Sequence, residues 1–339
     1  MKTLFLVQSN FGQGHHSRVN AFAENIYFKY IITQPFTGRG SEKEYFDNEF
    51  NNIYKEFKDY KPDIVVTEGF PFGRYGWHPH FNKEMKHDGI LEILREAKKL
   101  YSLDRDIPWV DPRDYWFHAE ILNEYYDGIL FHTDNNFINP KTFINNPILD
   151  IPFISTGYVC DTFKFETERK GILAYCGDWY PHTETIYHML LQLKDDVTFV
   201  VGKNTPRHLK ERMINIIERT DVNNFREQLF RHEVFVGNFG AGTFLDVNMT
   251  ETPAVMIPNP IHENSTPIYD TKGNIIDREE SYRAKRYEEF DFGRTIMYDD
   301  LTTDKLEHVI EESRKLKPKQ FDMNGKSFIK NIFNGESDV

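Results

Sequence analysis

Short apolar runs that end at glycine or proline recur along the chain, and segments with helical spacing follow them. The runs Thr3–Val7, Val197–Val201 and Val234–Val236 are rich in β-branched and aromatic residues, as strands buried on both faces of a parallel sheet are. Four further runs have the same character: Pro62–Thr67, Tyr126–Asp134, Gly171–Tyr175 and Ala254–Ile257. Strands that alternate with helices predict an α/β fold built on parallel sheets.

The intervening segments predict helices with one apolar face. In Ser41–Tyr60, phenylalanine and isoleucine side chains recur at helical spacing, which favours packing against a core. Arg207–Arg219 reads as a basic amphipathic helix with a solvated face. We predict further helices over Ser17–Ile26, Thr183–Leu193 and Phe321–Phe333.

Length and charge narrow the class of protein. A chain of 339 residues suits two domains of roughly 150 residues each. The net charge of −12 argues against a generally basic nucleic-acid or membrane binder. The two cysteines, Cys160 and Cys176, form no disulfide framework, and no apolar run reaches transmembrane length. The N-terminus reads as a strand, so we expect a cytoplasmic protein without an integral membrane segment.

The stretch from His232 to Glu263 predicts a strand, a glycine turn, a helix and a second strand. Its turn contains Gly240, Ala241 and Gly242, which let the backbone approach a ligand closely. Thr243 can begin a helix, and the exposed N–H groups of such a start suit a phosphate. Asp246 follows one turn later, where it can accept hydrogen bonds from a sugar hydroxyl. The pattern predicts a diphosphate-sized site, and a turn without a ligand is the alternative.

A second glycine turn follows the first strand, and it contains two histidines. Gly12 and Gly14 allow the turn, and His15 and His16 lie where the carboxyl edge of a sheet is expected. A histidine there can take a proton from a hydroxyl, because its ordinary pKa is close to neutrality. The alternative is that both imidazoles cap the turn or face solvent.

These segments resemble the GT-B glycosyltransferases, in particular the bacterial lipid I N-acetylglucosaminyltransferases. In that family a glycine turn precedes Thr-x-x-Glu, a strand ending in proline, and Glu-Gln-x-x-Arg-Ala. The matching residues here are Thr243-Phe244-Leu245-Asp246, Pro258 and Glu279-Glu280-Ser281-Tyr282-Arg283-Ala284. The chain departs from the family at two positions, where Asp246 replaces glutamate and Glu280 replaces glutamine.

The first half of the chain resembles the same group of enzymes. Its Gly12-Gln13-Gly14-His15-His16-Ser17-Arg18 matches Gly-x-Gly-His-x-x-Arg completely. Thr67–Arg74 matches a Thr-Glu-x-Phe-Pro-Phe-Gly-Arg segment, and a predicted helix over Leu91–Leu100 follows it. The strand before Asp134 and the sequence Thr156–Val159 match further segments of the family.

The resemblance implies two Rossmann-like domains that face one cleft. It places the acceptor-binding domain at residues 1–160, joined by a C-terminal helix at 320–335, and the donor-binding domain at 165–318. It implies an inverting transfer from a nucleotide-sugar donor, with a UDP-sugar as the expected donor and no metal or other cofactor required. His15 is the implied catalytic base, and Glu68 orients it or the acceptor hydroxyl.

The remaining site residues follow from the same resemblance. The implied donor-binding residues are Gly177, Asp178, Gly240, Ala241, Gly242, Thr243, Asp246, Glu279 and Glu280. The expected acceptor-binding residues are Gly14, His16, Arg18, Arg74, Trp77, His132 and Asp134. A structural role is the alternative for His132 and Asp134.

Two other functions are alternatives to sugar transfer, and several kinds of acceptor are compatible with it. A UDP-sugar 2-epimerase of the same fold would convert the donor without an acceptor, and a non-catalytic sugar-nucleotide-binding subunit would bind it without turnover. The acceptor alternatives are a lipid-linked sugar, a small molecule and a hydroxymethylated base in phage DNA. Cations and aromatic residues gather between Arg74 and Lys86, as contact with nucleic acid requires, whereas the net charge opposes DNA binding.

Overall fold

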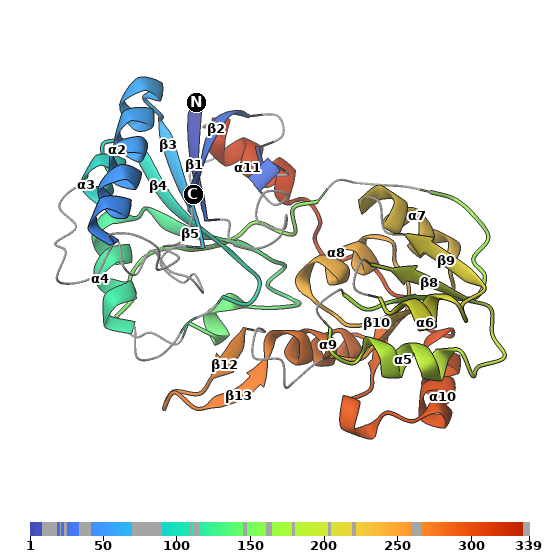
Figure 1. Cartoon of the computed structure of the whole chain (residues 1–339). Coiled ribbons are helices and arrows are strands. Elements are labelled where there is room, and N and C mark those ends of the chain that lie inside the picture. Colours follow the sequence, from blue (N-terminus) through green and yellow to red (C-terminus); the bar gives the residue numbers. More distant parts are fainter. Residues whose placement is uncertain are drawn as a thin grey trace. The chain divides into compact units, whose positions relative to one another are not determined.

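The computed structural model describes residues 1–8, 19–20, 22–23, 26–33, 42–69, 90–108, 110, 115–144, 148–160, 165–177, 180–202, 205–218, 222–258 and 266–334. The chain divides into two compact units (Figure 1). The first comprises Met1–Cys160, Thr266–Ile276 and Asp322–Val339, and the second comprises Asp161–Ser265 and Asp277–Phe321. Within the described ranges, no helix has the length and apolarity needed to cross a bilayer.

The first unit contains a six-stranded sheet in which all paired strands are parallel. Its strand order is β2-β1-β3-β4-β5-β6. The strands are β1 (Lys2–Gln8), β2 (Tyr27–Thr33), β3 (Ile64–Glu68), β4 (Lys99–Arg105), β5 (Gly128–His132) and β6 (Phe153–Ser155). Among the described residues its helices include α2 (Glu42–Tyr60), α3 (Ile90–Leu94), α4 (Tyr115–Tyr125) and the 3₁₀ helix η2 (Pro140–Thr142), and the C-terminal helix joins them.

Side chains that alternate along β1 fill two cores, one on each face of this sheet. Leu4 and Leu6 belong to a cluster with residues of α2, α3 and α4. Phe5 and Val7 belong to a second cluster, which includes Phe333 of the C-terminal helix α11 (Gly325–Asn334). The Phe333 ring lies 6.2 Å from that of Phe5. Helix α11, red in Figure 1, therefore completes the core of the first unit.

The second unit has the same architecture, with strand order β14-β11-β10-β7-β8-β9 and parallel pairing throughout. Its strands are β7 (Ile172–Tyr175), β8 (Val197–Val201), β9 (Asn215–Glu218), β10 (Val234–Gly237), β11 (Ala254–Met256) and β14 (Gly293–Thr295). Its helices are α5 (Thr183–Leu190), α6 (Arg207–Lys210), α7 (Val222–Arg231), α8 (Ala241–Met249), α9 (Glu279–Glu289), α10 (Thr303–Ser313) and the 3₁₀ helix η3 (Tyr298–Asp300).

Two of the predicted helices overlap strands that the sequence pattern does not indicate. The helix expected over Arg207–Arg219 ends at Lys210, and Asn215–Glu218 instead forms the edge strand β9 beside β8. Side-chain exposure alternates along β9, which is the period of a strand rather than of a helix. The helix expected over Leu91–Leu100 likewise ends at Leu94, because β4 begins at Lys99.

Between β11 and α9 the chain forms a two-stranded hairpin within residues 266–278. Its strands are β12 (Pro267–Tyr269) and β13 (Ile275–Arg278). Asp270 closes the turn, since its carboxylate accepts hydrogen bonds from the backbone N–H groups of Lys272 and Asn274. Residues 266–276 group with the first unit, although the resemblance counts them with the second domain.

Each sheet reverses its strand order next to its own first strand. From β1 the chain goes to β2 on one side and then returns to β3 on the other. From β7 it goes through β8 to β9, and then returns to β10 on the other side of β7. Open α/β sheets bind ligands at the carboxyl ends of strands where such a reversal occurs. The fold therefore indicates the β1–β3 edge and the β7–β10 edge as candidate sites.

Two glycines close to the β7–β10 edge should respond oppositely to alanine. A Cβ at Gly237 would lie 1.8 Å from the carbonyl oxygen of Tyr175, whereas a Cβ at Gly242 would meet nothing within 4 Å. We expect Gly237→Ala to lower the free energy of unfolding by about 3 kcal/mol. Gly242→Ala, in the first turn of α8, should leave it unchanged or raise it by up to about 1 kcal/mol. Chemical denaturation followed by circular dichroism measures both, and equal losses would contradict the packing described for β7 and β10.

Candidate active site

A side-chain amide joins three elements at the β7–β10 edge. Asn238 follows β10 directly, and its Oδ1 accepts a hydrogen bond of 3.0 Å from the backbone N–H of Gly177, just beyond β7. Its Nδ2 lies 3.5 Å from Oε1 of Glu280, in the first turn of α9. Asn238 therefore fixes the β7 loop, the β10 loop and Glu280 relative to one another. Gly177, one of the expected donor-binding residues, uses its backbone N–H in this contact.

The N-terminus of α8 opens at the same edge. Gly240 is its N-cap residue with an extended backbone, and it contributes no side-chain cap. The first turn, from Ala241 to Thr243, contains no acidic residue. The first N–H groups of a helix have no partner within the helix, and the helix dipole makes this end attractive to anions. The turn predicted from the sequence is therefore present, with donors suited to a diphosphate.

Glu280 lies beside this helix end. A Cβ added to Gly240 would be 3.5 Å from Glu280 Oε1, so the carboxylate and the N-cap are neighbours. Glu280 is partly exposed, whereas Glu279 is buried. A carboxylate repels phosphate but accepts hydrogen bonds from hydroxyl groups. Of the two predicted sugar-binding glutamates, Glu280 is the one that the structure places next to the turn.

Asp246 has a different environment from the one expected. Its Oδ1 accepts a hydrogen bond of 2.8 Å from Nε of Arg226 on α7, and the two side chains are 6% and 9% exposed. Aspartate is one methylene shorter than the family's glutamate, and here its carboxylate stays between α7 and α8. A hydrogen bond that Asp246 accepts from a ribose hydroxyl would have to compete with this ion pair, and it stays a prediction.

Arg283 belongs to the segment Glu279–Ala284, and it supports the loop after β10 from the interior of the second unit. Its side chain is completely buried, and its Nη1 donates to the carbonyl oxygen of Phe239 at 3.3 Å. Its guanidinium also lies 5.9 Å from the ring centroid of Phe244. Because this arginine is inside the protein, it positions the backbone of the turn and does not itself face a ligand.

The hydroxyl of Tyr187 anchors the loop after β7, which contains the buried thiol of Cys176. The backbone N–H of Cys176 donates to the Tyr187 hydroxyl, which donates to the carbonyl of Val200. Burial raises the pKa of the Cys176 thiol to about 12, so it stays protonated at neutral pH. A small cavity opens at this loop, lined by Cys176, Gly177, Tyr180, Pro181, Thr183, Glu184, Thr205 and Pro206.

Three predicted residues lie at the carboxyl edge of the first sheet. Glu68 ends β3 in register with Val7 of β1, and its side chain is buried. His132 is also buried, and it accepts a hydrogen bond from the backbone N–H of Val159. Asp134 accepts one of 2.9 Å from the backbone N–H of Asp322. These contacts give His132 and Asp134 structural partners at Val159 and Asp322, and their acceptor-binding role stays a prediction.

The other predicted site residues lie outside the described residues. These are Gly14, His15, His16, Arg18, Arg74, Trp77 and Asp178. The topology still locates where their segments attach. The segment with His15 leaves β1 after Gln8, and the segment with Arg74 leaves β3 after Glu68, so both start at the β1–β3 edge.

Two residues at the candidate site of the second unit were missed by sequence reasoning. Asn238 had a usable signal, because it is a polar residue placed directly after a buried strand and inside the glycine turn. Arg226 had none, because it lies in an amphipathic helix 20 positions before its partner Asp246.

No protein-family sequence model matches the chain, and no curated protein has a significantly similar sequence. Solved structures are similar over almost all of it. MurG of Acinetobacter baumannii superposes with a TM-score of 0.62 and 12% identity, covering 99% of this chain and 100% of that one. The UDP-GlcNAc 2-epimerase of Methanocaldococcus jannaschii superposes with a TM-score of 0.58 and 13% identity, covering 99% of each chain.

A third match is UGT2 of Phytolacca americana, solved in complex with UDP-2fluoro-glucose and pterostilbene. It gives a TM-score of 0.59 and 10% identity, covering 98% of this chain and 93% of that one. At these identities the likeness establishes the fold. The chain has the GT-B fold of two parallel-sheet α/β domains, which confirms the fold class predicted from the sequence.

The Asp246–Arg226 pair should matter for stability. Asp246→Ala leaves the Arg226 guanidinium buried without its carboxylate, and we expect a loss of about 3 kcal/mol in the free energy of unfolding. Asp246→Asn keeps an acceptor oxygen and should lose less. Replacing both residues, as Arg226→Met with Asp246→Leu, should recover most of the loss. Urea unfolding measures all three variants, and an Asp246→Ala variant of unchanged stability would show that the pair is not structurally important.

Proposed function

We propose that this protein is a glycosyltransferase that moves a sugar from a nucleotide-sugar donor, preferentially UDP-linked, to an acceptor hydroxyl. The observation that supports the proposal is the β7–β10 edge, where the helix N-terminus at Gly240 opens beside the carboxylate of Glu280. The helix N-terminus suits a diphosphate, and the carboxylate of Glu280 suits sugar hydroxyls. A nucleotide-sugar carries these two groups next to each other.

The N–H groups of the α8 turn would hold the diphosphate and stabilise the negative charge that develops as it leaves. This arrangement supplies the electrophilic assistance from the backbone, so the reaction demands no metal ion. Glu280, held by Asn238, would accept hydrogen bonds from the sugar, with Glu279 supporting it at the start of α9. Because Asp246 is paired with Arg226, we assign it to the positioning of α8 in preference to direct contact with the ribose.

His15 would act as the catalytic base on the acceptor side. Its imidazole removes the proton of the acceptor hydroxyl while that oxygen attacks the anomeric carbon. A bond forms from this carbon to the acceptor oxygen, and the bond to the diphosphate oxygen breaks. A single displacement of this kind inverts the anomeric configuration. Glu68, at the β1–β3 edge from which the His15 segment departs, would orient the histidine or the acceptor.

The acceptor group is a hydroxyl, and three kinds of molecule could carry it. A small molecule, a lipid-linked sugar and a hydroxymethylated base in phage DNA each present the required group. A base would have to leave the duplex stack to reach a protein site of this kind. The cations and aromatic residues between Arg74 and Lys86 favour DNA, and the net charge of −12 opposes it.

A 2-epimerase is the second candidate, because the UDP-GlcNAc 2-epimerase of Methanocaldococcus jannaschii has the same fold over nearly the same length. An epimerase would also bind a UDP-sugar, but it would convert the donor without any acceptor. The complete Gly-x-Gly-His-x-x-Arg match at residues 12–18 favours transfer. A binding subunit without activity would show neither reaction.

Nucleotide binding can be tested by thermal stabilisation with UDP, GDP, dTDP, CMP and ADP. A ligand at a hundred times its dissociation constant should stabilise the protein by about 2.7 kcal/mol, and we expect this with UDP. Gly240→Val should abolish the shift, because its side chain fills the space between the α8 turn and Glu280. The matched variant Glu280→Gln should keep the shift with UDP but bind the UDP-sugar about tenfold more weakly. If no nucleotide stabilises the folded protein, the donor site proposed here does not exist.

The role of His15 can be separated from binding by His15→Ala. We expect turnover to fall at least about a hundredfold, because general-base catalysis typically contributes that much, while stabilisation by UDP stays the same. NMR of the product should show an inverted anomeric centre. Weaker UDP binding with unchanged turnover would remove His15 from the mechanism, and donor conversion without an acceptor would establish the epimerase instead.

A further inference from the structure

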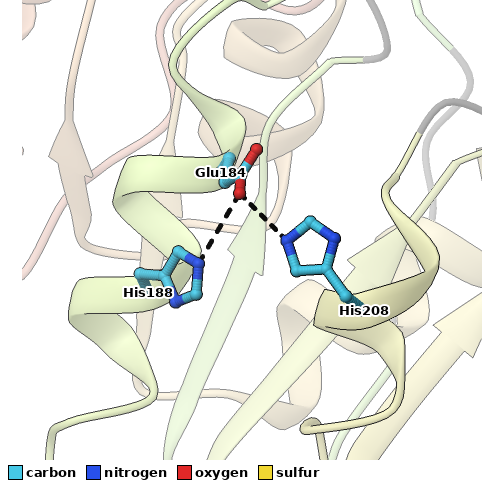
Figure 2. A group of neighbouring side chains, drawn as sticks. All are labelled: Glu184, His188 and His208. Atoms are coloured by element: carbon cyan, nitrogen blue, oxygen red, sulfur yellow. Dashed lines mark hydrogen bonds and ion pairs between the residues drawn. The ribbon is translucent and has the colours of Figure 1, made fainter.

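Helices α5 and α6 bring three potential metal ligands together on the surface of the second unit (Figure 2). Glu184 and His188 are four positions apart on α5, so they lie on one face of that helix, and His208 is on α6. Oε1 of Glu184 is 2.9 Å from Nε2 of His208 and 3.7 Å from Nε2 of His188. All three ligand atoms lie within 4.8 Å of one another, a convergence found for no other such group in the described ranges.

Imidazole nitrogen and carboxylate oxygen are ligands that zinc binds at about 2.0–2.2 Å. Ligand atoms in a tetrahedral site of this size are roughly 3.3 Å apart, so small side-chain rotations would bring these three into position. We propose that Glu184, His188 and His208 bind a divalent transition-metal ion of the Zn²⁺ class. Because all three side chains are at least partly exposed, the fourth position is open to water.

A neighbouring arginine disfavours metal binding, because it contacts one of the proposed ligands. Nη1 of Arg212 is 2.8 Å from Nδ1 of His188. A guanidinium only donates hydrogen bonds, so His188 accepts at Nδ1 and carries its hydrogen on Nε2, the atom that points towards Glu184. A metal on Nε2 requires the other tautomer, with Nδ1–H donated to an acceptor. Metal binding must therefore displace Arg212, which is exposed and able to move into solvent.

The site adjoins the cavity at the β7 loop. Glu184 lines that cavity together with Gly177, Thr205 and Pro206. Helix α5 follows the loop after β7, and α6 follows the loop after β8. A metal bound by Glu184, His188 and His208 would link the two helices and brace both loops. It takes no part in the proposed sugar transfer, and its presence can be tested separately.

The test is titration of the metal-free full-length protein with Zn²⁺ in competition with a chromophoric chelator. We expect one Zn²⁺ per chain with micromolar affinity, and at least tenfold weaker binding in His188→Ala and in His208→Ala. Arg212→Gln should bind about tenfold more tightly, because its amide oxygen can accept the Nδ1–H of His188. The matched control is His308→Ala, which removes another exposed histidine with a glutamate four positions away but no third ligand near it among the described residues. It should leave the affinity unchanged.

Circular dichroism confirms that each variant is folded before titration. Absence of stoichiometric binding below about 100 μM would overturn the proposal. So would unchanged affinity in the His188→Ala, His208→Ala double variant, because the metal would then bind elsewhere in the chain. Weaker binding in Arg212→Gln would show that the arginine supports the metal, contrary to the geometry. None of these outcomes depends on sugar transfer, so the metal site and the proposed function stand or fall separately.

Discussion

Parallel sheets bring the carboxyl ends of their strands to one edge, and a reversal of strand order opens space between two neighbouring strands at that edge. In both units the reversal lies beside the first strand, at β1–β3 and at β7–β10. The glycine turn at 237–242 follows β10, and the segment with Gly12 and Gly14 follows β1 in the sequence, so each comes after a member of one of these pairs. The location of both candidate sites is therefore a consequence of topology, and the residue types at the edges decide what chemistry each can perform.

Polar contacts then set the detailed shape of the candidate site at the β7–β10 edge. Asn238 connects two loops to Glu280, and Arg283 holds the carbonyl of Phe239 from inside the protein. Both contacts use side chains to satisfy the backbone or a carboxylate. Among the described residues, no side chain caps the N–H groups at the start of α8. The site is thus preorganised by residues that do not themselves need to touch a ligand.

Local pattern was sufficient for the buried strands β1, β3, β5, β7, β8, β10 and β11 and for the glycine turn after β10, because these depend on residues adjacent in the sequence. It did not indicate the other strands, most of which lie at or towards the edges of the sheets or in the hairpin. Val234–Val236 and Ala254–Ile257 became β10 and β11, and Ser41–Tyr60 became α2 with a one-residue difference. The pattern failed at Arg207–Arg219, where helical and strand spacing overlap and pairing with β8 decided the outcome. It also failed to anticipate that Asp246 pairs with Arg226, because a tertiary contact between two helices leaves no trace in either helix alone.

The path of the chain through the two units affects the order in which they can fold during synthesis. The six strands of the first sheet are complete at Ser155, but one of its faces is covered by Ile329, Ile332 and Phe333 near the C-terminus. The second unit ends at Phe321, so all of its residues leave the ribosome before the first unit can finish its core. Until α11 is translated, the apolar face around Phe5 and Tyr101 lacks its cover, and it is the natural surface for a chaperone to protect.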